Sequence, residues 1–348
     1  MKNSALILAL LSFSALSAEH ESCVEPCDPC DICIDPCDPC REHLFVERCQ
    51  LFVTGEFLYW TVEEGALEYA IKMNKSNGNP MTFAIGDYQI ADYDFCPGFR
   101  VALAWYNEPK YWEVSGQYTW LDSSGSDSTN APDVANRFLV PTWETDAMGY
   151  FTRATSKLDL NYQVGDLLVA RVFDPNPHLR MRILGGFTAA YIKQDWKVVY
   201  EDINDEVDTL ENGWRFWGGG FRLGLTADWF WGNQIYFTAR SSFATLLGDY
   251  ENTSKHKSTA SNPQNIGNAK YDDHRFAIHG QFMLGPSWQK PYECWSFELF
   301  AGYEFNVWMN IHEIIKVPFE DPSMSHQTQH SRGLFGTHGL TARLTIGF

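Results

Sequence analysis

After its first residues, the sequence has no apolar run long enough to span a bilayer as a helix. Its formal net charge of -18 argues against nucleic acid as a partner. Its ten His residues fall in no recognisable Ser/His/Asp or metal-ligand motif. We therefore expect neither an α-helical membrane protein nor an enzyme, and no catalytic residues, cofactor or bound metal.

The first 18 residues have the layout of a cleavable secretory signal peptide. Lys2 precedes an apolar run from Ala5 to about Leu16, which small residues at Ser17 and Ala18 follow. The run falls short of the roughly 18–20 residues that a spanning helix needs. We predict export, with residues 1–18 removed.

Apolar and aromatic residues recur at every second position instead of forming runs. Aromatic residues make up 15% of the chain and hydrophobic residues 45%. Period-two alternation predicts β-strands with two different faces. It is clearest in GFRVALAWY (98–106), YWEVSGQYTW (111–120) and RATSKLDLNYQV (153–164). Further strands are predicted at about 51–61, 178–194, 214–231, 234–247, 274–286, 294–309 and 335–348.

Three features favour a transmembrane barrel over a soluble β-sandwich. The strands run to about 9–18 residues, whereas typical globular strands have about 5–6. Short connections such as Gly232-Asn233 alternate with long ones such as 197–213 and 248–273. Aromatic residues crowd the short connections, as Trp229 and Trp231 do before Gly232. Outer-membrane barrels have short periplasmic turns, longer outer loops and aromatic girdles at both interfaces.

The predicted fold class is all-β: a transmembrane antiparallel β-barrel over residues 51–348, after a leader at 19–50. The chain ends on Phe348, and a terminal aromatic on an alternating strand looks like the assembly signal of bacterial outer-membrane proteins. Ten strands are clear, and the segment 66–90 adds a hairpin. We therefore favour twelve strands, with ten as the alternative.

The polar faces of the strands are expected to point into the lumen, and short connections on the periplasmic side set the strand directions. Charged residues there would form either an eyelet that filters solutes, biased toward anions, or Arg–carboxylate networks that brace a filled lumen. The sequence favours neither interpretation. The candidate lumen residues are Arg100, Glu113, Arg153, Lys157, Asp159, Arg180, Arg182, Arg222, Arg240, Arg275, Glu298 and Arg343.

The leader contains a tandem repeat, CVEPCDPCDI followed by CIDPCDPCRE. The spacing Cys27-Asp-Pro-Cys30 suits zinc or a redox motif as well as disulfides. Because an exported chain meets oxidising chemistry and the leader offers no thioredoxin-type domain, disulfides are favoured. The odd total of nine Cys points to an intermolecular bond or a free thiol. The disulfide candidates are Cys23, Cys27, Cys30, Cys33, Cys37, Cys40 and Cys49.

Several stretches also carry a family resemblance. They include GEFLYWTVEEGALEYAIK (55–72), CPGFRVALAWY (96–106), WGGGFRLGLTADWFWG (217–232) and the closing GLTARLTIGF. In their order along the chain, they resemble the major outer membrane protein family of Legionella and the related proteins of Chlamydia-like bacteria. The resemblance implies a pore-forming or structural outer-membrane barrel, and the family supplies no catalytic residues.

We therefore expect a porin-like outer-membrane barrel that admits small hydrophilic solutes by diffusion. The strand directions place the leader in the periplasm, where disulfides would join it to Cys-rich proteins or to other copies. Its remaining expected partners are outer-membrane lipid and the barrel-assembly machinery. The alternative is a structural envelope protein or a surface adhesin with little or no channel activity.

Overall fold

The computed structural model describes residues 50–73, 86–107, 110–133, 139–143, 151–259, 265–292, 295–316 and 329–348. The predicted signal peptide, and the disulfide candidates from Cys23 to Cys49, lie outside these residues. No helix in the described part of the chain is long and apolar enough to cross a membrane.

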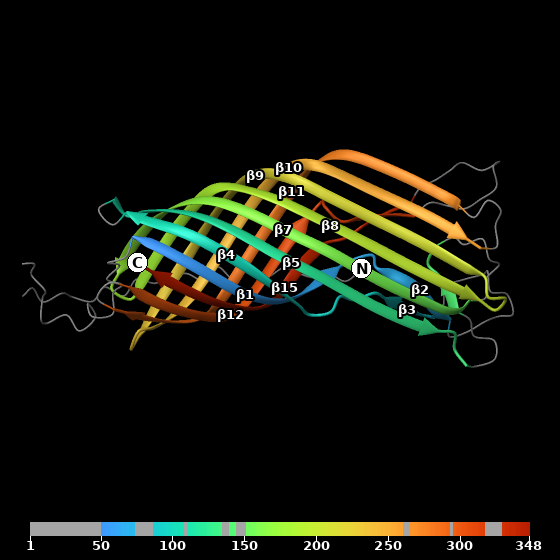
Figure 1. The fold of residues 1–348 in the computed structure, drawn as a ribbon, viewed down its shortest axis with the longest axis horizontal. Coiled ribbons are helices and arrows are strands. Elements are labelled where there is room, and N and C mark those ends of the chain that lie inside the picture. Colours follow the sequence, from blue (N-terminus) through green and yellow to red (C-terminus); the bar gives the residue numbers. More distant parts are fainter. Residues whose placement is uncertain are drawn as a thin grey trace, which may run out of the picture. The chain divides into compact units, whose positions relative to one another are not determined.

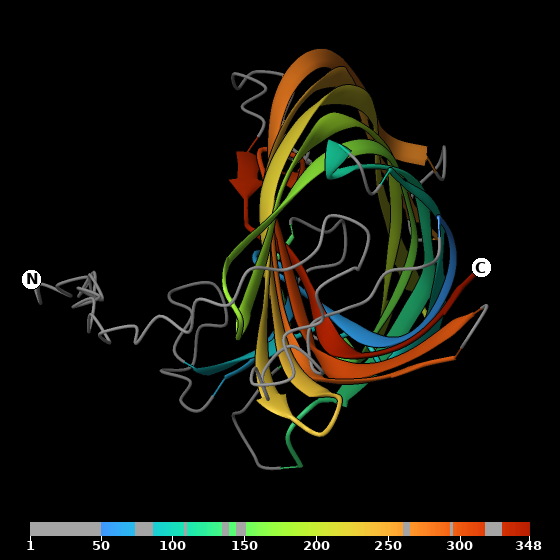
Figure 2. The same cartoon turned by 90° about the vertical axis from the view of Figure 1, so that its left-hand side faces the viewer.

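Within the described residues, ten antiparallel strands close into a ring (Figures 1 and 2). The order in the ring follows the sequence, and pairing of the first strand with the last closes it. The ring strands are β1 (Leu51–Glu64), β4 (Cys96–Asn107), β5 (Trp112–Asn130), β7 (Phe151–Asn176), β8 (Leu179–Asp202), β9 (Val207–Gly232), β10 (Ile235–Ser258), β11 (Asn265–Pro291), β12 (Ser296–Met309) and β15 (Phe335–Gly347).

The all-β barrel is confirmed, but the favoured count of twelve strands is wrong and the alternative of ten is right. The segment 66–90 does form a hairpin, of β2 (Glu68–Met73) and β3 (Gly86–Ile90), but it stays outside the ring. Its strands have 6 and 5 residues, fewer than the roughly 9–11 that span a membrane. β2 also pairs with β6 (Leu139–Pro141), and β13 (Glu313–Lys316) pairs with β14 (Gln329–Arg332).

Five ring strands, β7 to β11, are much longer than a membrane requires, with 24 to 27 residues each. At about 3.3 Å per residue they extend roughly 80–90 Å, against an apolar band about 25 Å high in such barrels. Much of the expected long connection 197–213 is therefore strand, because β8 ends at Asp202 and β9 begins at Val207. In Figure 1 these strands continue past the others toward the right.

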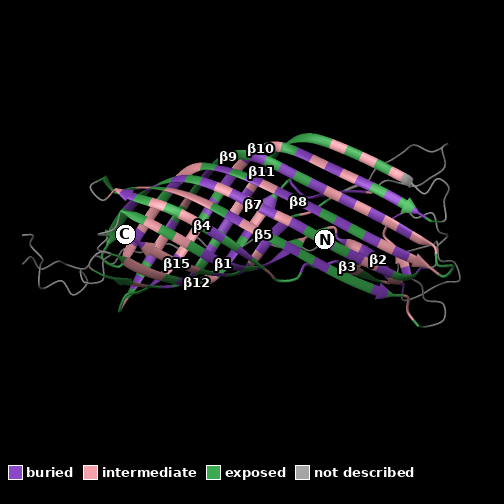
Figure 3. Ribbon diagram, viewed as in Figure 1, coloured by how far each residue is buried: buried purple, intermediate pink, exposed green. Residues whose placement is uncertain are grey.

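The outer face of the barrel has two zones. On β9, Trp217, Phe221, Leu223 and Trp229 are exposed, and they belong to an apolar band beside the short turns. The next outward residue beyond Trp217 is Arg215, and charged residues follow at the same level on the neighbouring strands. Figure 3 shows exposed and buried residues alternating along these strands. We take the apolar band as the membrane-facing zone, and the charged zone as the part that stands in water.

The predicted lumen position is wrong for three residues. Arg153, Lys157 and Asp159 lie exposed on the outer face of β7. Lys157 Nζ lies 2.9 Å from Asp159 Oδ2, and their side chains are 63% and 50% exposed. The opposite face of this stretch, with Leu158 and Tyr162, is buried inside the barrel. Beyond the apolar band the wall contacts water, so the apolar face turns inward as in a soluble protein.

Candidate functional site

The lumen of the barrel is the candidate site, and β1 shows how it is layered. Phe52, Thr54 and Glu56 line a cavity of about 150 Å³, here called the vestibule. The next inward residues on the same strand, Leu58 and Trp60, are fully buried in an apolar cluster. The vestibule reaches the short-turn rim, because residues near strand ends there also line it, namely Gln289, Ser296 and Thr345.

At the inner end of the vestibule, Arg100 binds two carboxylates. Its Nη1 donates to Glu56 Oε2 at 2.5 Å and its Nη2 to Glu304 Oε1 at 2.7 Å, while Nε donates to Thr119 Oγ1 at 2.8 Å. The pairing of β1 with β4 places Glu56 directly opposite Arg100. All four residues are buried. Charge-assisted hydrogen bonds of this kind fix the side chains across the lumen.

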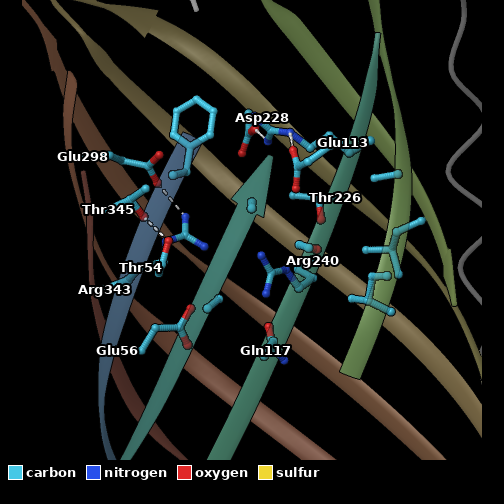
Figure 4. Close-up of a pocket in the computed structure, with 18 of the residues that line it drawn as sticks. Thr54, Glu56, Glu113, Gln117, Thr226, Asp228, Arg240, Glu298, Arg343 and Thr345 are labelled. Atoms are coloured by element: carbon cyan, nitrogen blue, oxygen red, sulfur yellow. Dashed lines mark hydrogen bonds and ion pairs between the residues drawn. The ribbon is translucent and has the colours of Figure 1, made fainter. Parts of the chain in front are cut away.

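Other inward-facing arginines are paired in the same way, as Figure 4 shows in part. Of the two interpretations of the charged residues, these contacts favour Arg–carboxylate networks that brace the wall. They do not favour an eyelet of free charges. The pairs are Arg222 Nε with Asp166 Oδ1 at 3.0 Å, Arg182 Nη1 with Asp228 Oδ2 at 2.5 Å, Arg343 Nη2 with Glu298 Oε1 at 2.7 Å and Arg180 Nε with Asp174 Oδ1 at 2.8 Å.

Above this charged layer, a continuous cluster of buried apolar side chains fills the lumen, here called the apolar closure. Trp60, Tyr162 and Trp308 lie on the side of the closure next to the charged layer. The Tyr162 and Trp308 rings are 6.2 Å apart and edge to face. Nine of the ten ring strands contribute buried residues, and β4 contributes partly buried Cys96, a free cysteine. Among the described residues, no group of His, Cys, Asp or Glu could hold a metal ion.

The chain after β12 folds into the mouth of the barrel and completes the closure. Inward-facing Asn252 donates to the Glu313 carbonyl at 2.5 Å, and Asn212 donates to the Ile315 carbonyl at 3.1 Å. Both Ile311 and Ile314 belong to the apolar cluster. Part of the long connection between β12 and β15 is therefore packed inside the barrel.

His312 lies buried at the start of this inserted segment. Its Nε2 is 2.7 Å from the Gly65 carbonyl oxygen, and its ring packs edge to face on Trp214 at 6.0 Å. Burial lowers the pKa of His312 to about 4, although the contact with the Gly65 carbonyl acts in the opposite direction. At neutral pH the imidazole is therefore uncharged, although the buried Glu64 Oε2 lies 3.8 Å from its Nδ1.

Nine of the twelve predicted lumen residues lie on the inward face. Eight of them, from Arg100 and Glu113 to Arg343, belong to the vestibule or its rim. Arg275 lies higher, where it binds Glu313 and stacks on the Tyr250 ring at 3.6 Å. The inward-facing predicted residues are Arg100, Glu113, Arg180, Arg182, Arg222, Arg240, Arg275, Glu298 and Arg343.

Sequence reasoning missed Glu56 and Asp166. Asp166 lies on the same face of β7 as Leu158 and Val164. Because polar faces were expected to point into the lumen, this largely apolar face was expected to contact lipid. A lone carboxylate at that position, inside the apolar band, was the available signal that this face points inward. Phe348 lies at the short-turn end, where its backbone N–H donates to the Leu51 carbonyl at 2.8 Å.

Several solved structures are similar to this chain. The outer membrane protease OmpT of Escherichia coli is 10% identical, with 86% of this chain and 97% of that chain covered and a TM-score of 0.45. The toluene transporter TodX of Pseudomonas putida is 10% identical, covering 86% and 90%, with a TM-score of 0.28. A Pseudomonas aeruginosa FadL homologue is 6% identical, covering 86% and 90%, with a TM-score of 0.25.

No curated protein matches the sequence. The model of one family does match, over residues 44–346, which includes nine strands of the ring and all but the last residue of β15. That family is described as the Legionella pneumophila major outer membrane protein precursor. The match confirms the resemblance seen in the sequence. The chain belongs to this major outer membrane protein family and is an outer-membrane β-barrel.

Proposed function

We propose that this barrel seals its own lumen and serves as a structural protein of the outer envelope. The observation that carries the proposal is the apolar closure, in which side chains from nine ring strands pack together. Water and ions cross a lumen only where it holds water, or where free polar groups can replace the water molecules around them. In the closure, Trp60, Tyr162 and Trp308 are packed among other buried side chains, and the buried polar groups near them, such as Gln194 and His279, already bind other side chains.

Barrel size supports the same function. About eight strands enclose an interior just wide enough for side chains to fill it, whereas porins of roughly 16–18 strands leave an aqueous channel. The ring here has ten strands, close to the lower limit. The charged layer at Arg100 strengthens the seal, since each described carboxylate there contacts the guanidinium directly.

Porin-like diffusion of small hydrophilic solutes is the second candidate. The vestibule favours it, because charged side chains of both signs, including Glu113, Arg182 and Glu298, line a cavity that reaches the short-turn rim. For solutes to pass, the apolar closure and the inserted segment at 311–316 would have to move aside.

A structural role also fits the disulfide prediction for the leader. Cross-links from Cys23 to Cys49 would join the barrel to periplasmic Cys-rich proteins or to neighbouring copies. In extracts prepared with a thiol-blocking reagent, non-reducing gels are expected to show high-mass species that collapse on reduction. Replacement of all seven candidates by Ser should abolish them, and a monomer under both conditions would contradict the cross-linking.

Conduction separates the first two candidates. The barrel is refolded into vesicles, and folding is verified by its altered mobility on gels before and after heating. A sealed barrel gives no swelling of sugar-loaded vesicles, whereas a porin in the same vesicles gives rapid swelling. Swelling of vesicles that contain the folded protein would favour the porin-like candidate.

A further inference from the structure

The vestibule holds one arginine that differs from its neighbours. Arg240 projects inward from β10 and lines the cavity together with Arg182, Arg222 and Arg343. Each of those three contacts a carboxylate. Arg240 makes no ion pair or hydrogen bond with any described residue, and its buried Nε has no partner. In Figure 4, no dashed line reaches its guanidinium group.

The carboxylates of the vestibule are already engaged elsewhere. Glu56 binds Arg100, and Glu298 binds Arg343. Asp228 lies 2.5 Å from Arg182 Nη1, and Glu113 lies 3.7 Å from Arg182 Nε. None of these carboxylates contacts Arg240, so its positive charge faces the open volume of the cavity.

Arg240 is partly buried and its Nε is fully buried, and a charged group in such a place is normally paired or binds a ligand. The guanidinium group is planar, carries five donors and always holds its charge, which suits carboxylate and phosphate oxygens. Thr226 lies directly opposite Arg240 on β9 and adds a hydroxyl group to the same wall. A cavity of about 150 Å³ is of the size that accepts benzene in an engineered protein core, so it has room for a small anion.

We propose that the vestibule is a binding site for a small oxyanion, of the size of phosphate or a short carboxylate, with Arg240 as its principal ligand. The anion enters from the short-turn side, because the vestibule reaches that rim and the apolar closure lies beyond it. The Thr226 hydroxyl donates to a second oxygen. Binding at this site does not require conduction, so it holds whether the lumen is sealed or opens.

The test uses the full chain folded in detergent micelles and inorganic phosphate, with the phosphorus-31 line width as the readout. Acetate, followed by its carbon-13 line width, is the second probe. Arg240→Gln removes the charge, and Arg240→Lys keeps the charge but loses the planar donor set. Arg215→Gln is the matched control, because Arg215 lies on the outer wall with its side chain 51% exposed.

We expect saturable broadening of at least one probe by the wild type, and the same broadening by R215Q. R240Q should weaken binding at least about tenfold, which is about 1.4 kcal/mol, with R240K in between. Absence of saturable broadening with both probes would overturn the proposal, as would equal binding by wild type and R240Q. Altered gel mobility on heating verifies that each variant is folded. A loss of line broadening in a folded variant therefore results from the change at the binding site.

Discussion

Replacing Arg100 by Met tests whether the charged layer braces the barrel. Arg100→Met removes the guanidinium but keeps much of the side-chain length. It leaves Glu56 and Glu304 facing each other without the cation that binds both, and both carboxylates are almost fully buried. Breaking a buried pair by removing one partner costs roughly 3–5 kcal/mol. We expect the free energy of unfolding to fall by about that amount.

Urea unfolding in lipid vesicles, followed by tryptophan fluorescence, measures the change. The matched control is Lys157→Met, which breaks the exposed pair with Asp159 on the outer wall. Exposed pairs contribute about 1 kcal/mol or less, so this control should differ little from the wild type. The triple variant R100M/E56Q/E304Q removes the stranded charges and should recover most of the loss. A loss below about 1 kcal/mol for R100M would refute the bracing role.

Two further predictions concern the membrane zone and the inserted segment. Leu223→Arg places a charge on the exposed middle of the apolar band and should cost about 2–4 kcal/mol in vesicles. Thr253→Arg, on the water-facing wall, loses the hydrogen bond of Thr253 Oγ1 to the Gly213 carbonyl and should cost about 1 kcal/mol or less, and equal costs would contradict the zones. His312, whose pKa falls from 6.5 to about 4 on burial, binds fewer protons when folded. The free energy of unfolding of the wild type, relative to that of His312→Gln, should therefore decline as the pH falls from about 6.5 to 4, and parallel profiles would contradict this.

The transmembrane zone was predictable because its pattern depends on residues that are close together in the sequence. Alternation in GFRVALAWY and the aromatic residues beside Gly232 reflect lipid on one side of the wall and a polar lumen on the other. The same rule fails above the band. Around Lys157 the outer side is water, so the identical alternation has the opposite orientation, and only the position of the band decides which applies.

The candidate site was less predictable, since it depends on pairing across the ring. Arg100 and Glu304 are 204 residues apart, and no local pattern indicates that one binds the other. The inward position of Arg240 follows from alternation, but its lack of a partner depends on how the neighbouring carboxylates pair. The fold of the segment after β12 into the mouth is likewise a long-range effect, fixed by Asn212 and Asn252.

Single-channel recording in planar bilayers tests the sealed barrel most directly. Folded wild-type protein is added at defined salt concentration, beside a porin as a positive control for insertion. Because the apolar closure fills the lumen, we predict no stable conductance steps from the wild type. Reproducible steps, at protein levels where gels confirm the folded form, would contradict the seal and establish the porin-like function instead.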